Sequence, residues 1–428
     1  MSTLTQLQAK LSLKAKLEPK FRFYTLYGHL HRDDVLREAW KTVKRNGGTA
    51  GIDNISIRDI EQSNKRVSGF LQEIREELIT KKYYPKPVKR VFIPKSDGRL
   101  RPLGIPTVKD RVVQAALRLA IEPIFEQDFL ACSYGFRPEK SAHQAVGAIQ
   151  DAVYSGKRQV YDADLKGYFD SIPHDKLMLA VERRIADKQV LKLIQKWLRA
   201  PIWEPGKPMK VNEQGTPQGG VISPLLANIY LHWFDKIFNG PNGPGIWAKA
   251  VLIRYADDFV VMARYITKKV KTWIEGTLED RFGLTINREK TKIVDLEAPK
   301  GQLDFLGFTM RWWKVRTAQW KKFCSQMPSK KSLKRARERV REITSPKNGY
   351  RPVEDIVKRL NLFLLGWGQY FHQGNPSEAF GSLNTYVDER MTHYLQRRSQ
   401  KSFKKKSGTW YEEMRRLGVV QLTKQLFV

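Results

Sequence analysis

The feature of this sequence that most constrains its fold is a pair of adjacent aspartates between two apolar runs. Residues 251–263 read Val-Leu-Ile-Arg-Tyr-Ala-Asp-Asp-Phe-Val-Val-Met-Ala. Runs of this type predict two strands joined by a tight turn, with Asp257 and Asp258 at the tip of the hairpin. Aspartate suits a turn, but an ordinary turn has no need of a second carboxylate that repels the first. A bound divalent cation would remove the repulsion, so the pair is interpreted as part of a metal site.

A further candidate acid lies at the end of another predicted strand. The segment 159–165 reads Gln-Val-Tyr-Asp-Ala-Asp-Leu, and the alternation of a strand places Asp162 and Asp164 on one face. If this strand pairs with the hairpin, Asp164, Asp257 and Asp258 could hold two Mg²⁺ ions about 3.5–4 Å apart, an arrangement suited to in-line phosphoryl transfer. Either segment alone is weak evidence. Together they predict a polymerase-type site.

The charge of the chain predicts a polyanionic partner. Lys and Arg number 77 against 44 Asp and Glu, a net charge of +33. The excess is densest between Arg311 and Val428, where 26 basic residues face nine acidic ones. A run of charge is usually a solvated surface, but one without acidic counterparts favours binding to phosphates. The candidate nucleic-acid-binding residues lie on a helix predicted over 330–343 and in a basic run beside Trp410 and Tyr411: Lys330, Lys331, Lys334, Arg335, Arg337, Arg341, Arg397, Arg398, Lys404, Lys405 and Lys406.

Other patterns exclude several classes of protein. Cys132 and Cys324 are far apart and unpaired in any motif, which argues against a disulfide framework or a Cys-rich zinc site. The chain shows neither the apolar core of a signal peptide nor an uncharged apolar stretch of about 18 residues. We therefore expect no membrane association and a location in the cytoplasm or nucleoid of a bacterium, or in an organelle. The sequence favours no oligomeric state.

The remaining elements indicate an α/β body followed by a mostly helical basic region. Residues 83–108 predict a hairpin that turns at 96–98, and helices are predicted over 33–45 and 112–121. The loop Gly215-Thr-Pro-Gln-Gly219 leads into a helix with Ser223 at its cap position and Pro224 in its first turn. The helix is explained as structure alone, whereas the glycine-rich loop is better explained by backbone lying close to a nucleotide.

In their order, these motifs resemble those of group II intron-encoded reverse transcriptases. Asp164, the Gly-Thr-Pro-Gln-Gly loop and the Tyr-Ala-Asp-Asp turn are followed by Gly283-Leu-Thr-Ile-Asn-Arg-Glu-Lys-Thr-Lys292 and Leu303-Asp-Phe-Leu-Gly-Phe308. The resemblance runs from about residue 20 to the end: 33–53 is similar to the family's N-terminal extension, 93–107 and 133–138 to its fingers, 360–371 to its thumb, and 397–420 to the short tail of members that lack an endonuclease domain.

The resemblance implies a right-hand polymerase of the α/β class. Residues 1–158 would form the N-terminal extension and fingers, 159–312 a palm whose antiparallel sheet carries the Tyr-Ala-Asp-Asp hairpin, 313–400 a helical thumb or maturase domain, and 401–428 a short basic tail that binds DNA. The implied activity is Mg²⁺-dependent addition of dNTPs to a DNA primer on an RNA template. The implied role is that of a maturase in a ribonucleoprotein: it binds its group II intron RNA, assists splicing, and copies the intron into a DNA target during retrotransposition. We do not expect the protein to cleave the target strand. We expect DNA synthesis to be primed from existing DNA ends.

The resemblance also implies roles for single residues. Asp164, Asp257 and Asp258 would be the catalytic metal ligands. Lys95 and Arg101 would clamp the triphosphate, Phe169 would reject a ribose 2′-hydroxyl, Gln218 would lie under the incoming nucleotide, and Lys290 would donate a proton to pyrophosphate. Asp162 and Asp170 match family positions that are not ligands.

Two alternatives remain open at this stage. The same enzyme could serve a host function such as phage defence or CRISPR spacer acquisition, a question that the gene neighbourhood would answer. Alternatively, the chain could be a non-catalytic splicing cofactor that uses only its basic surfaces. The complete set of three aspartates argues against the second alternative.

Overall fold

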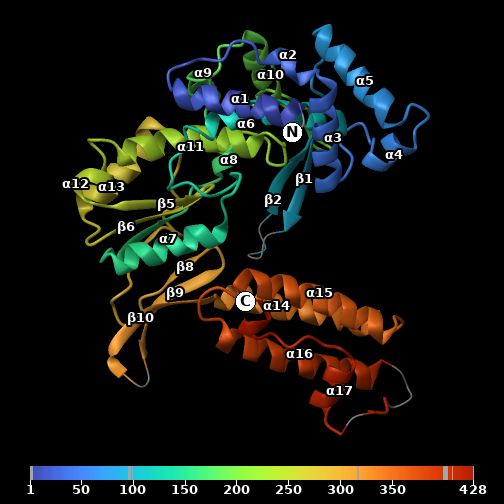
Figure 1. The fold of residues 1–428 in the computed structure, drawn as a ribbon, viewed down its shortest axis with the longest axis vertical. Coiled ribbons are helices and arrows are strands. Elements are labelled where there is room, and N and C mark those ends of the chain that lie inside the picture. The colour runs from blue at the N-terminus through green and yellow to red at the C-terminus, as the bar shows by residue number, and fades with distance from the viewer. Residues whose placement is uncertain are drawn as a thin grey trace. The chain divides into compact units, whose positions relative to one another are not determined.

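The computed structural model describes residues 3–94, 98, 100–315, 318–398, 403–406 and 408–427, and Lys95 therefore lies outside the described residues. The chain forms two compact units (Figure 1). The first comprises residues 1–141 and 161–292, and the second comprises residues 142–160 and 293–428. Each unit is described separately below, and the four-part division drawn from the sequence remains a prediction.

Helices form most of the first unit. They are α1 (Thr3–Leu17), α2 (Tyr27–Leu30), α3 (Asp33–Asn46), α4 (Ile57–Gln62), α5 (Arg66–Ile79), α6 (Val108–Phe125), α8 (Tyr168–Ser171), α9 (His174–Glu182), α10 (Lys188–Leu198), α11 (Ser223–Asn239), α12 (Pro244–Trp247) and α13 (Lys268–Gly276), the last continuing as a π turn over Thr277–Arg281. The predicted helices over 33–45 and 112–121 are confirmed as α3 and as part of α6.

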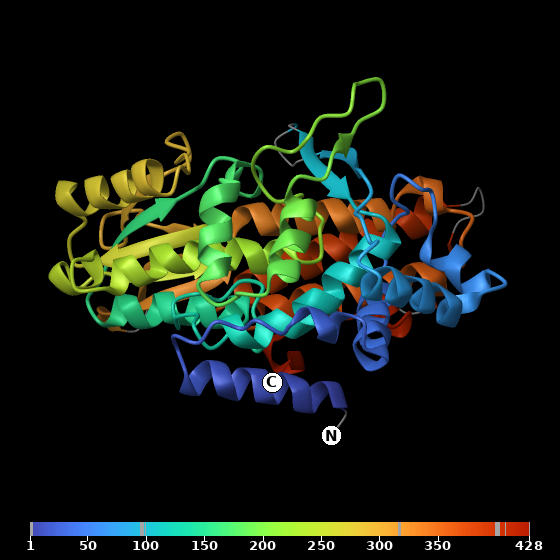
Figure 2. The same ribbon diagram turned by 90° about the horizontal axis from the view of Figure 1, so that it is seen from above.

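Helix α6 is the centre of the helical layer, because it is buried on most of its circumference. Helices α1 and α3 pack on it, and α1 lies at the edge of its unit in Figure 2. Helix α3 presents Val35, Leu36, Ala39, Trp40 and Val43 to this core. Its first turn carries two aspartates and its last turn two basic residues, which complements the helix dipole.

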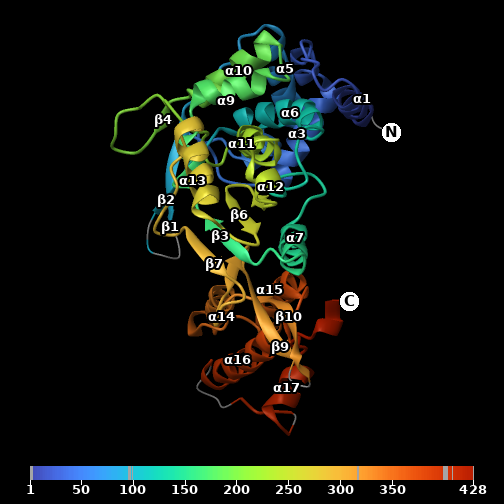
Figure 3. The same cartoon turned by 90° about the vertical axis from the view of Figure 1, so that its left-hand side faces the viewer.

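Two small sheets belong to this unit or begin in it. Strands β1 (Val88–Pro94) and β2 (Leu100–Ile105) form the antiparallel hairpin predicted over 83–108, and the two-residue β4 (Ile202–Trp203) runs parallel to β1. The second sheet has the order β5-β6-β3-β7, with β3 (Gln159–Ala163), β5 (Val251–Tyr255), β6 (Asp258–Ala263) and β7 (Lys292–Asp295) (Figure 3). The strand that precedes Asp164 therefore lies next to the hairpin, which is the condition that the sequence analysis set for a shared site.

Within the described residues, a three-stranded antiparallel sheet and five α-helices make up most of the second unit. The strands are β8 (Leu303–Phe305), β9 (Phe308–Val315) and β10 (Ala318–Pro328), in the order β10-β9-β8. The helices are α7 (Ala142–Tyr154), α14 (Lys330–Ile343), α15 (Val353–Phe371), α16 (Ser377–Arg397) and α17 (Trp410–Arg416), with 3₁₀ turns at Pro346–Asn348 and Lys424–Phe427. The predicted helix over 330–343 is confirmed. The helical part begins only at Lys330, however, because Phe308–Val315 and Ala318–Pro328 pair with each other as strands.

Among the described residues, no helix combines the length and the apolar character that crossing a membrane requires.

Candidate active site

The Tyr255–Asp258 segment is a two-residue turn that closes the β5–β6 hairpin. Tyr255 and Asp258 are register partners, so Ala256 and Asp257 form the turn itself. Ala256 adopts a φ of +59°, a left-handed conformation that is uncommon for a residue with a Cβ atom. Such a conformation persists only where the surroundings hold it in place.

A buried arginine, which the sequence analysis did not single out, holds this turn. Arg254 is fully buried and donates one hydrogen bond to the Ala256 carbonyl oxygen at 3.0 Å. Its other donors meet Asp235 Oδ2 at 2.6 Å, Asn228 Oδ1 at 2.9 Å and Ser133 Oγ at 2.8 Å. A guanidinium group satisfied on every side fixes the backbone of the turn. The available signal was a single basic residue inside an otherwise apolar strand.

The segment 132–135 lies against the same turn. The backbone N–H of Arg254 donates to the Cys132 carbonyl oxygen at 2.8 Å, and the N–H of Tyr134 donates to the Arg254 carbonyl oxygen at 2.8 Å. A Cβ atom on Gly135 would come within 2.3 Å of the Ala256 nitrogen. Glycine at this position therefore allows the two backbones to approach each other.

Asp164 follows β3 directly and is held by the segment after the π turn. Its Oδ2 accepts a hydrogen bond from Asn287 Nδ2 at 2.9 Å, and Lys290 Nζ lies 3.3 Å from the same oxygen. The backbone is fixed as well, because the N–H of Asn287 donates to the Asp164 carbonyl oxygen at 2.8 Å. Lys290, predicted to act on pyrophosphate, is thus paired with a carboxylate of the site in this structure.

The carboxylates interact electrostatically. Burial and the negative charge of Asp164 raise the pKa of the Asp257 carboxyl group, while Arg101 and Arg254 lower it. Burial, followed by repulsion from Asp257, Asp164 and Asp162, raises the pKa of Asp258 to about 6. The strand end and the hairpin tip therefore form one electrostatic cluster with excess negative charge.

The predicted nucleotide loop is fixed to the β1–β2 hairpin. Arg101 Nε donates to Gln218 Oε1 at 2.8 Å, and Gln218 Nε2 donates to Asp170 Oδ2 at 3.2 Å. The backbone N–H of Gly104 donates to the Gln218 carbonyl oxygen at 2.6 Å. Since Arg101 also lowers the pKa of Asp257, the structure brings Arg101, Gln218 and the carboxylates into one site.

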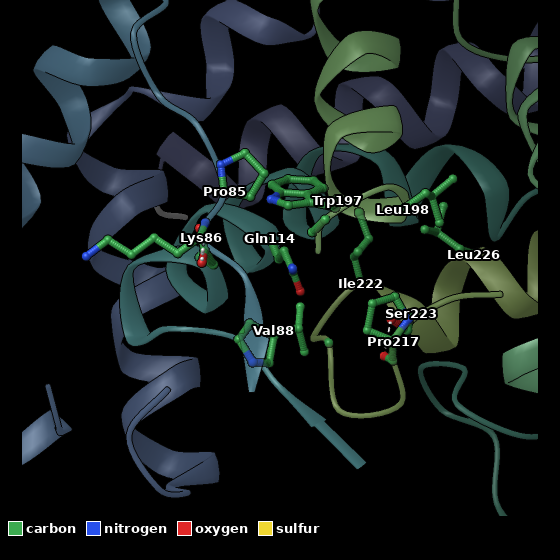
Figure 4. Close-up of a pocket in the computed structure, with 14 residues that line it drawn as sticks. Pro85, Lys86, Val88, Gln114, Trp197, Leu198, Pro217, Ile222, Ser223 and Leu226 are labelled. Atoms are coloured by element: carbon green, nitrogen blue, oxygen red, sulfur yellow. Dashed lines mark hydrogen bonds between the residues drawn. The ribbon is translucent and has the colours of Figure 1, made fainter. Parts of the chain in front are cut away.

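The base of this loop rests on a packed layer, which Figure 4 shows. Pro217 and Ser223 lie near Val88, Gln114 and Trp197, around a cavity of about 10 Å³. The Ser223 hydroxyl donates to the Pro217 carbonyl oxygen at 2.9 Å. Ser223 is the first residue of α11 and does not cap it, contrary to the prediction, because its hydroxyl closes the loop instead.

Phe169 lies beneath the loop. Its side chain is buried and makes edge contacts with Phe136 and Tyr168, with ring centroids 6.5 Å and 5.5 Å away. Its carbonyl oxygen accepts a hydrogen bond from the Thr216 N–H at 2.6 Å. The ring is therefore packed against two aromatic neighbours, and the backbone of Phe169 is bonded to the loop.

The candidate nucleic-acid-binding residues belong to the second unit. Most of their side chains are exposed: Lys330, Lys331, Lys334, Arg335, Arg341, Arg397, Lys404, Lys405 and Lys406. Two are partly buried, since Arg337 donates to Ser382 Oγ at 2.7 Å and Arg398 donates to the Arg351 carbonyl oxygen at 3.0 Å. On α14 the basic residues surround a buried stripe of Ala336, Val340 and Ile343, as predicted.

The three carboxylates have the ligand chemistry that Mg²⁺ requires, but their side chains are not grouped around a single point. Carboxylate oxygens are the ligands that Mg²⁺ prefers. Burial raises the pKa of Asp257 and Asp258, and repulsion between the acids adds to it, so a cation would stabilise the charged carboxylates. Within the part of the chain that the structure describes, no three His, Cys, Asp or Glu side chains are grouped closely enough to hold a metal ion. One oxygen of Asp164 is taken by Asn287 and Lys290.

Comparison with known proteins identifies the families whose sequences this chain resembles. Residues 93–310 match the family profile described as "Reverse transcriptase (RNA-dependent DNA polymerase)", and residues 333–417 match "Group II intron, maturase-specific domain". The chain is 36% identical to Protein YkfC of Escherichia coli over 325 residues, covering 68% of this chain and 84% of that protein.

Two further relatives carry intron names. The chain is 37% identical to the group II intron-encoded protein LtrA of Lactococcus lactis over 215 residues, half of this chain but only 35% of LtrA. It is 26% identical to the putative COX1/OXI3 intron 2 protein of Saccharomyces cerevisiae, covering 84% of this chain and 46% of that protein. The chain thus spans less than half the length of both.

The sheet, the hairpin and the matched profile place the protein in the class of RNA-directed DNA polymerases with a right-hand fold. Within that class, the chain belongs to the group II intron reverse transcriptase and maturase family. Enzymes of this family use dNTPs and a divalent metal.

Proposed function

We propose that this protein extends a DNA primer on an RNA template, with Asp164, Asp257 and Asp258 as ligands of two Mg²⁺ ions. The observation that carries the proposal is the placement of the three acids: Asp257 and Asp258 share the hairpin tip after β5, and Asp164 directly follows the strand β3 that neighbours β6. Burial raises the pKa of both hairpin carboxyl groups, and the charge of Asp164 raises it further. When bound, the ions would lower the pKa of the primer 3′-hydroxyl and neutralise charge on the leaving pyrophosphate.

The other residues position the nucleotide. Arg101 supplies a fixed positive charge at the triphosphate, beside the pair of Gln218 and Asp170 that holds the loop. The buried ring of Phe169 would act as the gate against a ribose 2′-hydroxyl, which would favour dNTPs over NTPs. Lys290 starts from its contact with Asp164 and would move to the leaving pyrophosphate.

We further propose that the protein is a maturase that binds its own intron RNA and, later, a DNA target. Support comes from the maturase-specific match over 333–417 and from the exposed basic side chains of α14. Binding of this kind is dominated by phosphate contacts and weakens steeply with salt. Sequencing of the RNA that copurifies with the protein tests this role, and recovery of bulk cellular RNA without enrichment of an intron would contradict it.

Primer extension on poly(rA)/oligo(dT) tests the catalytic proposal. We expect Asp257→Ala to remove detectable extension, because the site loses a carboxylate that its surroundings are arranged to hold. Asp304→Ala is a matched control, since it removes an aspartate of β8 in the second unit. Equal extension by the wild type and Asp257→Ala would refute the catalytic assignment.

A further inference from the structure

A pocket in the second unit combines aromatic rings with positive charge and takes no part in the site described above. Its volume is about 380 Å³, and it is formed by the loop 296–301 together with Arg311, Trp312 and Trp313 of β9. The volume falls within the range of about 300–1,000 Å³ that small-molecule sites occupy. A single flat ring system fits such a space, and a double helix does not.

The strand pairing explains why this pocket exists. Strand β8 pairs with β9 only over Phe308–Met310, and its Leu303 is the partner of Met310. Beyond that point, within the described residues, β9 has a strand neighbour on the β10 side only, where Arg311 pairs with Ser325. The loop 296–301 borders the pocket that contains Arg311–Trp313.

The aromatic rings are layered with cations. The Arg311 guanidinium lies 4.0 Å from the centroid of the Trp313 ring, and the Arg158 guanidinium lies 5.0 Å from that of Trp312. Tyr154 meets the Trp312 ring edge-on at 6.1 Å. Stacked guanidinium and indole planes are the surfaces on which unpaired nucleobases stack.

Hydrogen-bond donors at this place lack acceptors. Among the described residues, nothing accepts from Nε of Arg311 or Nε1 of Trp312, which line the pocket, or from Nε of Arg158. All three atoms are closed to solvent, so a ligand can reach them only if the side chains turn. Each such donor costs free energy unless a partner arrives. The net charge around the pocket is positive. Glu297 is paired with Arg158, whereas Arg311 and Lys300 form no ion pair with a described residue. A ligand that carries negative charge would complement the cations that line the pocket.

We propose that the pocket formed by residues 296–301 and 311–313 binds an unpaired nucleotide of a single-stranded nucleic acid. The base stacks on the Trp313–Arg311 pair, and its phosphate lies beside the positive charge of Arg311 and Lys300. The proposal rests on the proposed nucleic-acid function and adds to it a site for unpaired bases outside the carboxylate cluster. RNA and DNA offer the same chemistry here, and the experiment separates them.

Fluorescence anisotropy with four labelled probes tests the site: oligo(U), oligo(dT), an abasic oligomer of the same length, and an RNA duplex. We expect Trp313→Ala to weaken oligo(U) and oligo(dT) binding about 5- to 150-fold, the range for loss of one base–aromatic stack. Binding of the abasic oligomer and the duplex should not change. A loss confined to one polymer assigns the pocket to that nucleic acid.

Trp247→Ala is the matched control, because Lys269 lies 4.7 Å from the Trp247 ring but the indole N–H already donates to the Asn242 carbonyl oxygen. It should leave all four affinities unchanged. An unchanged oligo(U) and oligo(dT) affinity in Trp313→Ala, or an equal loss on the abasic oligomer, overturns the proposal.

Crosslinking provides a test that depends on no variant. Wild-type protein irradiated with 5-iodouridine oligonucleotide should yield a crosslinked peptide that contains Trp312 or Trp313, and crosslinks found only elsewhere would overturn the proposal. Extension of preformed poly(rA)/oligo(dT) at saturation should persist in Trp313→Ala. Failure of the pocket is thereby distinguished from failure of the catalytic proposal, which Asp257→Ala tests.

Discussion

The two sides of the carboxylate site are held by different means. On the hairpin side, Arg254 is fully buried and its hydrogen bonds fix the turn that carries Asp257 and Asp258. On the strand side, Asp164 is held by Asn287 and by the exposed Lys290. A buried network resists change, whereas an exposed ion pair contributes little and exchanges easily. The hairpin that carries Asp257 and Asp258 is therefore preorganised. Asp164, by contrast, can exchange the Lys290 ammonium group for another cation.

The largest effect should follow from loss of the buried arginine. Arg254→Met leaves Asp235 buried without its partner, so the free energy of unfolding should fall by about 3–5 kcal/mol. Chemical denaturation measures this value. Arg288→Gln, which removes the exposed pair with Glu279, is the control and should cost less than about 1 kcal/mol. Similar losses of unfolding free energy in the two variants would contradict the distinction between a buried network and an exposed ion pair.

The second largest effect should follow from adding a Cβ atom to the segment that packs against the hairpin. Gly135→Ala places a Cβ atom 2.3 Å from the Ala256 nitrogen, so the turn must shift. We expect a stability loss of about 1–3 kcal/mol together with a marked fall in primer extension. Gly147→Ala is the control, because a Cβ atom there meets nothing within 4 Å. Normal extension by Gly135→Ala would show that the position of the turn is not critical.

Acid should weaken the hairpin side through His232. Burial, then Lys236 and Arg254, lower the pKa of this histidine to about 3. The folded state therefore keeps His232 neutral, while the unfolded chain takes up a proton below its ordinary pKa of about 6.5. The histidine's contribution to stability is complete above that pH and is lost as the pH falls toward 3, at up to about 1.4 kcal/mol per pH unit.

Denaturation curves at several pH values measure this dependence. His232→Gln should flatten the loss of stability between about pH 6.5 and 4. Replacement of the exposed His393 by Gln should leave the slope as it is. An unchanged slope in His232→Gln would assign the acid sensitivity to other groups.

The smallest effect is expected on the strand side. Lys290→Gln removes the cation that lies 3.3 Å from Asp164, so Mn²⁺, used as a probe for Mg²⁺, should bind about two- to five-fold more tightly. Electron paramagnetic resonance of free Mn²⁺ measures the affinity. Lys292→Gln, which removes the partner of Asp162 at 3.7 Å, should change it less. Weaker binding by Lys290→Gln would mean that the lysine supports the metal site.

The sequence was sufficient to predict the parts of the fold and the site that depend on local pattern. Apolar, β-rich runs on both sides of Asp257 and Asp258 predicted the hairpin, and the apolar spacing on α3 and α14 predicted those helices. Contacts between distant segments could not be predicted in this way. The bond from Arg254 to Asp235 and the pairing of Asn287 with Asp164 depend on tertiary packing.

Two details differed from prediction for related reasons. Ser223 has the composition of a helix cap, but its hydroxyl is used by the Pro217 carbonyl oxygen of the loop before it. The predicted helical region beyond residue 312 begins with strand, because β9 pairs with β10 as far as Pro328. In both places a nearby partner outweighed the local preference.

The position of β3 in its sheet has a consequence for any motion at the site. Its order between β6 and β7 leaves this strand no open edge, so its main chain cannot slide or accept an added peptide. When a ligand binds, Asp164 must respond by rotation about its own side-chain bonds, while the backbone of β3 keeps its position.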